Sequence, residues 1–430
     1  MPDILKYQPS DLEHRLEPGQ LALLQMVADV AAARQLPLYL VGGFVRDVLL
    51  GIPAADLDLV VEGDAIALAR ELASRYGGRV TAHLRFGTAQ WFRPGPGNKS
   101  LDFISTRSET YKHPGALPTV KRSGLSDDLA RRDFTINTLA LRLDGKLWGE
   151  LRDDLGGLDD LERGLVRVLH PGSFFDDPTR LFRAVRYEQR YGFRIVPETL
   201  SLIPQARHLI NSLSAERLRH ELDLILAEEK VVAMLSRLNE LGLLQPVHSA
   251  LKWNSAKRRR FGNGLRQDPE HPIKGIPASL ERDFLGWHFW LMDIPSVDLE
   301  SLEQRLHFSS KLLASLSAAS ALYTDLTSMA ELKPSQCVAR LESLPLLAVY
   351  SVYLANPEAK GSRNLRKYLE TWRRLKPKTN GQALIERGLP PGPLYKQVLL
   401  RLREAWLDGE VRTEKEELNL LEELTNLAAR

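Results

Sequence analysis

The sequence predicts an α+β fold, in which a small mixed sheet comes first and a longer helical region follows. Short apolar and alternating segments, which are typical of strands, are confined to about the first 175 of the 430 residues. Beyond them, apolar residues recur mainly at helical spacing. More than one core is expected in a chain of this length, because single cores rarely grow beyond roughly 250 residues.

The individual elements of the N-terminal region follow from its hydrophobic pattern. Apolar residues three and four positions apart indicate helices, whereas short apolar or alternating runs indicate strands. A pair of glycines at 77 and 78 ends one of the helices. The expected elements are helices over residues 20–34 and 64–76, and strands over residues 38–41, 56–61, 79–84, 86–92 and 101–106. Together they predict a small α/β unit.

Composition excludes several classes of protein. The hydrophobic fraction of 43% and charged fraction of 26% are those of an ordinary globular chain. A single cysteine, Cys337, excludes an internal disulfide framework and a multi-cysteine metal site. The first residues lack the apolar core of a signal peptide, and no window approaches 18 uncharged apolar residues. We therefore expect a cytoplasmic protein without a membrane partner; the sequence does not give its oligomeric state.

The net charge of +3 is too small to identify a polyanionic partner, but charge is unevenly distributed. Residues 251–290 hold eight basic and four acidic side chains, and residues 356–403 hold twelve basic and three acidic ones. Residues 404–424, in contrast, hold two basic and eight acidic side chains. Basic segments in the helical region suit binding to a phosphate backbone, although a solvated helix face explains any one of them equally well.

The first group of candidate functional residues lies around the strand at 38–41. Gly42 and Gly43 follow this strand and open a helix, so free backbone N–H groups there can hold a triphosphate. Asp56 and Asp58 are two apart on a predicted strand and share a face, where paired carboxylates can hold two Mg²⁺ ions. Asp102, on a later apolar strand, can add a third carboxylate. Alone, Asp-x-Asp is common in turns and on solvated strand faces, and Gly-Gly more often ends an element than binds phosphate.

A second group is the pair Arg131 and Arg132, which we place at the start of a helix. Because a helix N-terminus favours anions, two arginines there suggest a bound phosphate. The alternative is a surface arginine pair whose charge is offset by Asp127, Asp128 and Asp133.

A third group begins at Asp177, which we expect to cap a helix whose first residue is Pro178. At 100° per residue, one side of this helix carries a stripe of arginines. Asp177 can accept from the amino group of cytosine or adenine, and Arg180 can donate to the neighbouring ring acceptor. The pattern therefore predicts selection of C or A by side chains in place of a template. The stripe consists of Arg180, Arg183, Arg186 and Arg190.

These motifs resemble the class II tRNA nucleotidyltransferases, the CCA-adding family of the DNA polymerase β superfamily. The resemblance covers at least residues 38–200. It rests on GGFVRD at 42–47, DLD at 56–58, RRDFTIN at 131–137, DLGGLDDL at 154–161 and DDPTRLFRAVRYEQRYGF at 176–193.

The resemblance implies Mg²⁺ at Asp56 and Asp58, and it implies base recognition by Asp177 and Arg180. Further nucleotide contacts are implied for Gly43, Arg46 and Arg132, with support from Arg183 and Arg186. It also implies ATP and CTP as substrates and tRNA as partner, with the acceptor and T arms on the basic C-terminal surface. The implied domains are a catalytic head at 1–150, a base-recognising neck at 151–210, a helical body at 211–335 and a tRNA-binding tail at 336–430.

Two features bear on whether the chain adds CCA or only the terminal A. The family's Glu-Asp pair is Asp176-Asp177 here, and this wording resembles the A-adding branch. Residues 107–124 resemble the flexible loop that permits the use of ATP, which argues against a CC-only enzyme. CCA addition and A addition are equally compatible with the sequence.

Two further alternatives remain open from the sequence. A bacterial poly(A) polymerase shares this kind of head, but its branch carries a G-R-R-F-K/R stretch where this chain has Leu84-Arg85-Phe86-Gly87-Thr88. A non-catalytic RNA-binding protein with a degenerate head is disfavoured, because Asp56 and Asp58 are both present.

Overall fold

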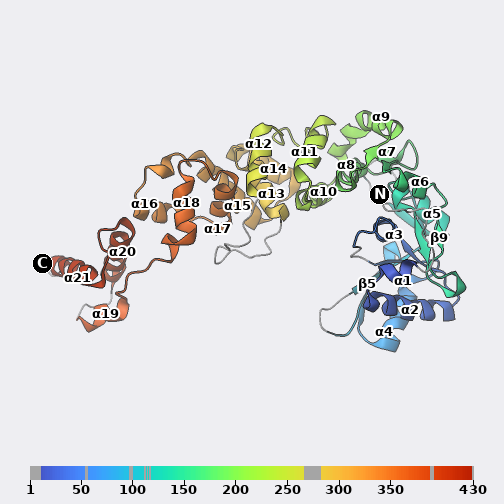
Figure 1. The fold of residues 1–430 in the computed structure, drawn as a ribbon, viewed down its shortest axis with the longest axis horizontal. Helices are drawn as coiled ribbons and strands as arrows, with labels where there is room; N and C mark the ends of the chain where they lie inside the picture. The colour runs from blue at the N-terminus through green and yellow to red at the C-terminus, as the bar shows by residue number, and fades with distance from the viewer. Residues whose placement is uncertain are drawn as a thin grey trace. The chain divides into compact units, whose positions relative to one another are not determined.

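The computed structural model describes residues 11–53, 57–95, 100–110, 113, 115, 118–265, 282–387 and 392–428. The chain divides into two compact units. The first comprises residues 1–221 and 240–246, and the second comprises residues 222–239 and 247–430. The large sheet lies in the first unit and the second is helical (Figure 1). The predicted α+β class is confirmed.

A seven-stranded mixed sheet organises the first unit, with strand order β3-β4-β5-β2-β1-β8-β9. Only β2 and β5 within this sheet pair in parallel, and the other neighbours are antiparallel. The strands at 38–41, 56–61, 79–84, 86–92 and 101–106 are confirmed in the described residues. Their bounds are β1 Leu38–Val41, β2 Asp58–Val61, β3 Arg79–His83, β4 Thr88–Phe92, β5 Ser100–Ser105, β8 Ala140–Arg142 and β9 Leu151–Arg152.

The alternation of side chains along β1 and β2 gives the sheet two buried faces. On one face, Tyr39 and Val60 pack against Leu125 and Leu129 of α5. On the other, Leu59 is fully buried, and α4 packs against β4 and β5. Both faces are covered because successive strand residues point to opposite sides. The helices here are α1 Asp11–Arg15, α2 Pro18–Ala33, α3 Gly43–Leu49, α4 Ala65–Tyr76 and α5 Leu125–Ala130.

Helix α4 begins and ends where its sequence predicts. The Asp64 side chain accepts a hydrogen bond of 3.0 Å from the Ala67 N–H, which satisfies one free donor of the first turn. Gly77, at φ 79°, follows the last helical residue. The helix predicted over residues 64–76 is therefore confirmed.

The helices that follow the sheet complete the first unit. They are α6 Gly157–Glu162, α7 Ser173–Asp176, α8 Arg180–Tyr191, α9 Pro197–Ala206 and most of α10 Ala215–Ala227. A two-stranded parallel ribbon joins β10 Leu165–Val166 to β11 Arg194–Ile195. A separate antiparallel hairpin joins β6 Arg107–Thr110 to β7 Thr119–Arg122, within the residues compared above to a flexible loop.

The glycines of the DLGGLDDL motif have different physical roles. Gly156 is in the left-handed region at φ 73°, with open space where a side chain would stand. Gly157 begins α6, and a Cβ there would lie 2.3 Å from the backbone oxygen of Thr135. Close approach of α6 to the Thr135 backbone thus requires the second glycine.

We expect Gly157→Ala to lower the thermal unfolding midpoint more than Gly156→Ala. The first substitution drives a methyl group into a backbone oxygen, which forces α6 away from residues 135–137. The second costs about 1 kcal/mol of backbone strain. Thermal unfolding of both variants tests this, and an equal or reversed order would contradict the packing reason.

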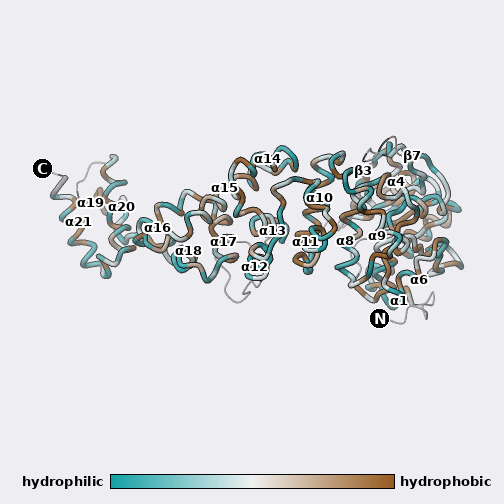
Figure 2. The backbone as a smooth tube through the Cα atoms, turned by 90° about the horizontal axis from the view of Figure 1, so that it is seen from above, coloured by the Kyte–Doolittle hydropathy of each residue, from teal (hydrophilic) through white to brown (hydrophobic). Residues whose placement is uncertain are grey.

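The second unit consists of helices in the part of the chain that the structure describes. Along its tube, teal and brown alternate as expected for amphipathic helices (Figure 2). The Gly/Pro-rich composition of residues 261–277 is typical of a loop. The structure differs at the start of this stretch, because α12 extends to Gly264 and Phe261 is fully buried. Residues 266–281 lie outside the described residues. The helices are α11 Val231–Glu240, α12 Ser255–Gly264, α13 Arg282–Leu291, α14 Ser296–Leu306, α15 Ser310–Thr324, α16 Pro334–Leu341, α17 Leu346–Ala355, α18 Ser362–Glu370, α19 Gly381–Glu386, α20 Pro393–Asp408 and α21 Glu414–Ala428.

Within the described residues, no single helix is long and apolar enough to cross a membrane. The bent pair α16 and α17 passes that test only when its two helices are taken together.

Candidate functional site

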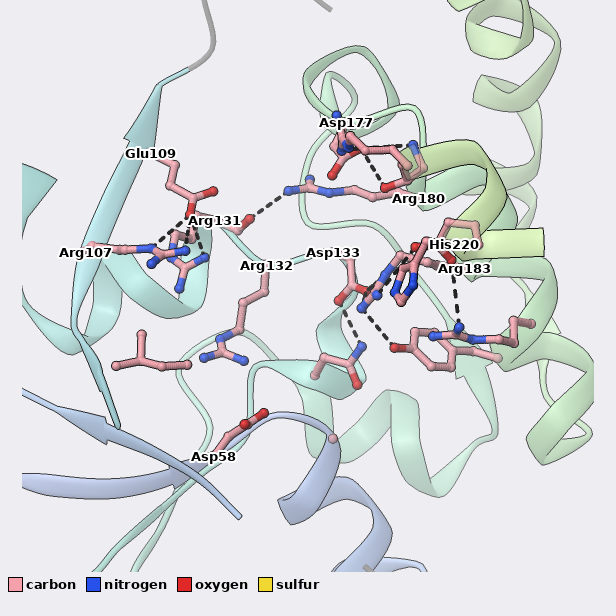
Figure 3. Close-up of a pocket in the computed structure, with 18 residues that line it drawn as sticks. Asp58, Arg107, Glu109, Arg131, Arg132, Asp133, Asp177, Arg180, Arg183 and His220 are labelled. Atoms are coloured by element: carbon pink, nitrogen blue, oxygen red, sulfur yellow. Dashed lines mark hydrogen bonds and ion pairs between the residues drawn. The ribbon is translucent and has the colours of Figure 1, made fainter. Parts of the chain in front are cut away.

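A cavity of about 850 Å³ lies in the first unit, lined mostly by charged side chains. The lining combines seven arginines with five carboxylates, so it suits a polyanionic ligand that also carries hydrogen-bonding edges. Asp58 lies at one end of the cavity, and Asp177 and Arg180 lie at the other (Figure 3). Its charged residues are Asp58, Arg107, Glu109, Arg131, Arg132, Asp133, Asp177, Arg180, Arg183, Arg186, Arg217 and Glu221.

Strand pairing brings Asp58 and Asp102 together. They are direct partners in the parallel register of β2 and β5, so their side chains point to the same face of the sheet. Both residues are exposed. Asp58 lines the cavity; Asp102 is beside it in register but is not among the lining residues. Asp56 lies outside the described residues, so its predicted position beside Asp58 stays a prediction.

The donor set of this sheet edge fits a hard divalent cation. Among the described residues there is no group of three or more histidine, cysteine or acidic side chains placed to hold a metal. Asp58 and Asp102 are nevertheless opposed on neighbouring strands, and carboxylate oxygens are the ligands that Mg²⁺ prefers. Asp56, two residues before Asp58, would be the further carboxylate.

Gly42 and Gly43 join β1 to α3 beside this edge. Gly42 has φ 74° and immediately precedes the first residue of α3, as the predicted glycine turn requires. A Cβ on Gly42 would lie 2.6 Å from Nη1 of Arg132, so the glycine admits that guanidinium. Gly43 lines the cavity. The turn thus places the backbone of Gly42 and Gly43 beside the Arg132 side chain at the cavity wall.

The placement of Arg131 and Arg132 at a helix start is wrong. They follow α5, whose last residue is Ala130, so they stand at a helix C-terminus, where the helix dipole favours cations. Both donate to the fully buried Asp128, at 2.7 Å from Arg131 and 3.0 Å from Arg132. Although burial opposes ionisation, these two arginines hold the pKa of Asp128 below its usual value. The arginine pair therefore needs no phosphate to explain it.

Glu109 of the β6–β7 hairpin links two further arginines of the wall. Its Oε1 accepts from Arg107 at 3.0 Å and from Arg131 at 2.9 Å. Arg107 also donates to the backbone oxygen of Phe86 at 2.9 Å. These bonds tie the base of the hairpin to the end of α5.

Asp133 and Arg183 form the central ion pair of the cavity. Arg183 donates through Nε at 2.8 Å and Nη2 at 2.6 Å, and Asn137 donates to the other oxygen at 2.9 Å. Burial raises the pKa of Asp133, but Arg183 and Asn137 outweigh burial and lower it to about 2. The pKa of Arg183 is raised, chiefly by Asp133. Both groups are therefore charged at neutral pH.

This pair predicts a contribution to stability that depends on pH. The pKa of Asp133 in the folded protein, about 2, lies below the value of 3.8 for a free aspartate side chain. The stabilisation is fully present above about pH 4 and is lost as the pH falls towards 2, which amounts to about 2 kcal/mol. We expect the difference in unfolding free energy between the wild type and Asp133→Asn to shrink by about two-thirds of that amount between pH 6 and pH 2.5. Urea unfolding at both pH values measures it, and a constant difference would contradict the ion pair.

Arg46 is placed differently from the predicted nucleotide contact. It is 4% exposed and does not line the cavity. Its Nε donates to Asp47 at 2.9 Å, and its guanidinium lies over the rings of Tyr187 and Tyr191, at 5.0 and 4.7 Å. Burial lowers its pKa, but the tyrosines and Asp47 raise it overall. Arg46 therefore joins α3 to α8 from behind the cavity wall.

The start of α8 differs from the expected cap at Asp177. The helix begins at Arg180, because Asp177 and Pro178 form a turn in which Asp177 Oδ1 accepts from the Thr179 N–H at 2.9 Å. Arg180 is 5% exposed and donates to Ser173 Oγ at 2.6 Å and to the Arg131 backbone oxygen at 2.8 Å. Both Asp177 and Arg180 line the cavity. The turn and these bonds fix the two side chains next to each other.

Of the four arginines in the predicted stripe, Arg180, Arg183 and Arg186 line the cavity, and Arg190 does not. Arg186 faces Glu221 of α10, with Nη1 and Oε2 separated by 3.8 Å. Burial raises the pKa of Glu221, although Arg183 and Arg186 oppose this. In the described part of the chain, neither of these two atoms has a hydrogen-bond partner. Arg186 and Glu221 thus form a long, buried ion pair between α8 and α10, without a hydrogen bond between these two atoms.

Sequence reasoning missed the contribution of α10. Arg217 and Glu221 are four residues apart on this helix, and both reach the cavity. The available signal was this spacing, which puts two charged residues on one face of an amphipathic helix. It gave no indication that the helix packs beside Asp177.

A mixed sheet with a carboxylate edge and an arginine-lined cavity suits a protein that binds nucleoside phosphates. A family model described as the poly A polymerase head domain matches residues 38–167. A second model, described as the probable RNA and SrmB-binding site of polymerase A, matches residues 192–253.

Relatives of known activity identify the family. An A-adding tRNA nucleotidyltransferase of Halalkalibacterium halodurans is 34% identical and is matched over 96% of this chain and 95% of its own length. One of Geobacter sulfurreducens is 35% identical over 95% of this chain, which spans 47% of that longer protein. A CCA-adding enzyme of Limosilactobacillus fermentum is 26% identical over 88% of this chain and 91% of its own. The chain belongs to the tRNA nucleotidyltransferase family of enzymes.

Solved structures agree with this membership. The Thermotoga maritima CCA-adding enzyme complexed with tRNA has a TM-score of 0.77 and 29% identity, over 97% of this chain and 98% of that one. A complex of a CCA-adding enzyme with ATP has a TM-score of 0.79 and 29% identity, over 97% and 98%.

Proposed function

We propose that the protein adds AMP to the 3′ end of tRNA from ATP, without a nucleic-acid template, and that Asp177 and Arg180 select the base. The observation that supports this most is a single cavity with a carboxylate edge at Asp58 and a carboxylate–guanidinium pair at the opposite end. One bound nucleotide could present its phosphates to the first and its base to the second.

At the phosphate end, Asp56 and Asp58 would hold Mg²⁺, with Asp102 as a third carboxylate. When bound, Mg²⁺ supplies activation of the attacking 3′-hydroxyl and neutralises charge on the leaving pyrophosphate. Arg132, beside Gly42 and Gly43, is placed to donate to the triphosphate. In this proposal Arg132 holds the triphosphate beside the carboxylates that would bind the metal.

At the base end, Asp177 supplies an acceptor and Arg180 supplies donors. Adenine and cytosine each present an amino donor beside a ring acceptor, which matches this order. Guanine and uracil present a carbonyl oxygen in place of the amino group. That acceptor would lie opposite the carboxylate of Asp177, which is also an acceptor, so no hydrogen bond could form. The buried Asp133–Arg183 pair keeps the wall between the two ends charged and fixed.

Addition of the terminal A is favoured over CCA addition by the names of the relatives. Relatives at 34% and 35% identity over nearly the whole chain are A-adding, whereas a CCA-adding relative matched over 88% of the chain shares 26%. CCA addition remains the second candidate, since structures similar to this chain include CCA-adding enzymes with ATP and with CTP.

The branch is tested with labelled CTP and ATP on tRNAs that end at the discriminator base, at C and at CC. We expect AMP to be added only to the tRNA ending in CC, and CMP to none. Incorporation of CMP into either shorter tRNA would establish CCA addition instead. Because the proposed mechanism uses Mg²⁺, nucleotide incorporation should stop when EDTA removes the metal.

A further inference from the structure

Arg217 of α10 contacts the base-reading end of the cavity. Its Nη2 donates to Asp177 Oδ1 at 2.6 Å, and its Nη1 donates to the backbone oxygen of Gly115 at 3.1 Å. The two side chains are 26% and 20% exposed, so this ion pair is only partly screened by solvent. Arg217 therefore contacts the one carboxylate to which base selection is assigned.

The two oxygens of Asp177 are used very differently. Oδ1 accepts from the Thr179 N–H at 2.9 Å, the Thr179 hydroxyl at 2.7 Å and Arg217 at 2.6 Å. No hydrogen bond to Oδ2 is found within the described residues. The donors are thus concentrated on one oxygen, and the other remains available at the cavity.

A carboxylate needs such restraint to read a base edge. The last torsion of an aspartate side chain is broad, so the group turns easily unless it is held. The two Thr179 donors come from the same turn as Asp177, whereas Arg217 comes from a separate helix and holds the group from outside. A fixed carboxylate discriminates because a wrong base must then leave polar groups unpaired.

We infer that Arg217 is a positioning residue for base selection: it holds Asp177 Oδ1 so that Oδ2 faces the amino group of the incoming base. This inference rests on the proposed function, since it assigns to Arg217 a role that acts through Asp177. Arg217 carries no part of the transfer chemistry itself.

The test is a double-mutant cycle read out as base discrimination. The ratio of kcat/KM for ATP to that for GTP is measured on tRNA ending in CC, for the wild type, Arg217→Gln, Asp177→Ala and the double variant. We expect Arg217→Gln to lower the ATP/GTP ratio about tenfold when Asp177 is present. It should have no further effect when Asp177 is replaced by alanine. Arg217→Lys, which keeps the charge, should retain part of the ratio.

Two controls separate positioning from folding. Arg194→Gln replaces an exposed arginine of the same unit outside the cavity, and should leave the ratio unchanged. Thermal unfolding of each variant reports its stability. If Arg217→Gln does not fold, Arg217→Lys carries the test through a lowered ratio with an unchanged KM for tRNA.

The outcomes distinguish the inference from the proposed function. An unchanged ratio in Arg217→Gln, with a lowered ratio in Asp177→Ala, overturns the inference and leaves the proposed function in place. Equal effects of Arg217→Gln in both backgrounds also overturn it, because Arg217 would then act independently of Asp177. An unchanged ratio in Asp177→Ala overturns base reading by Asp177, and the inference falls with it.

Discussion

Replacing Asp58 by alanine is expected to reduce nucleotide incorporation on the order of 10³-fold or more while tRNA binding survives. The substitution removes a carboxylate that lines the cavity and opposes Asp102 across β2 and β5. Metal-ion stabilisation of a transition state is worth several kcal/mol, and each 1.36 kcal/mol is tenfold in rate. Single-turnover incorporation of labelled ATP, with tRNA binding measured by filter retention, checks both parts.

A matched control for this variant is Asp159→Ala. Asp159 lies on α6 and is 59% exposed, in an ion pair with Arg163 outside the cavity. Its loss should leave incorporation near the wild-type rate. Activity retained by Asp58→Ala would rule out the assignment of metal binding to this edge of the sheet.

The second large effect concerns base choice. Asp177→Ala should lower the preference for ATP over GTP roughly 10- to 100-fold, because a good bidentate side-chain contact to a base is worth about 1–3 kcal/mol of discrimination. Asp177→Asn should go further and admit GTP, since its amide can donate to the guanine carbonyl. Steady-state kinetics with each nucleotide on tRNA ending in CC measure both.

The neighbouring carboxylate provides the control for this prediction. Asp176 is the last residue of α7, with its side chain 39% exposed and 3.4 Å from His170, and it does not line the cavity. Asp176→Ala should keep the wild-type preference. If it changed base choice as much as Asp177→Ala, selection would depend on the whole turn and not on Asp177.

Much of the first unit could be predicted from the sequence because its signals are local. Strand β1 is an uninterrupted apolar run, and α4 is bounded by a capping aspartate and a glycine. The stripe of Arg180, Arg183 and Arg186 follows from helical spacing alone. Each of these features depends only on neighbouring residues.

The features that failed or were missed depend on where elements end and what they pack against. Arg131 was placed at a helix N-terminus, where the dipole disfavours cations. It in fact follows the C-terminus of a short helix that ends at Ala130, where the dipole favours them. The cap at Asp177 was misplaced, since its side chain closes a turn with Thr179 in place of starting the helix. The nucleotide contact of Arg46 stays a prediction, and sequence reasoning missed that its guanidinium lies over two tyrosine rings of α8.

The sequence indicated that Asp102 can join Asp58, but it did not give the direct contacts between distant segments. Asp58 and Asp102 are separated along the chain and become neighbours only through the register of β2 and β5. Arg217 meets Asp177 only because α10 packs beside the start of α8. No local pattern contains either pairing.

The central claim is that one cavity performs a single, base-selected transfer without a template. The most direct measurement incubates the protein with Mg²⁺ and tRNA ending in CC, together with each of the four nucleoside triphosphates in turn, and resolves the product lengths. The account predicts one added nucleotide with ATP and little or none with GTP and UTP. A long ladder of adenylates, equal use of all four nucleotides, or no extension at all would contradict it.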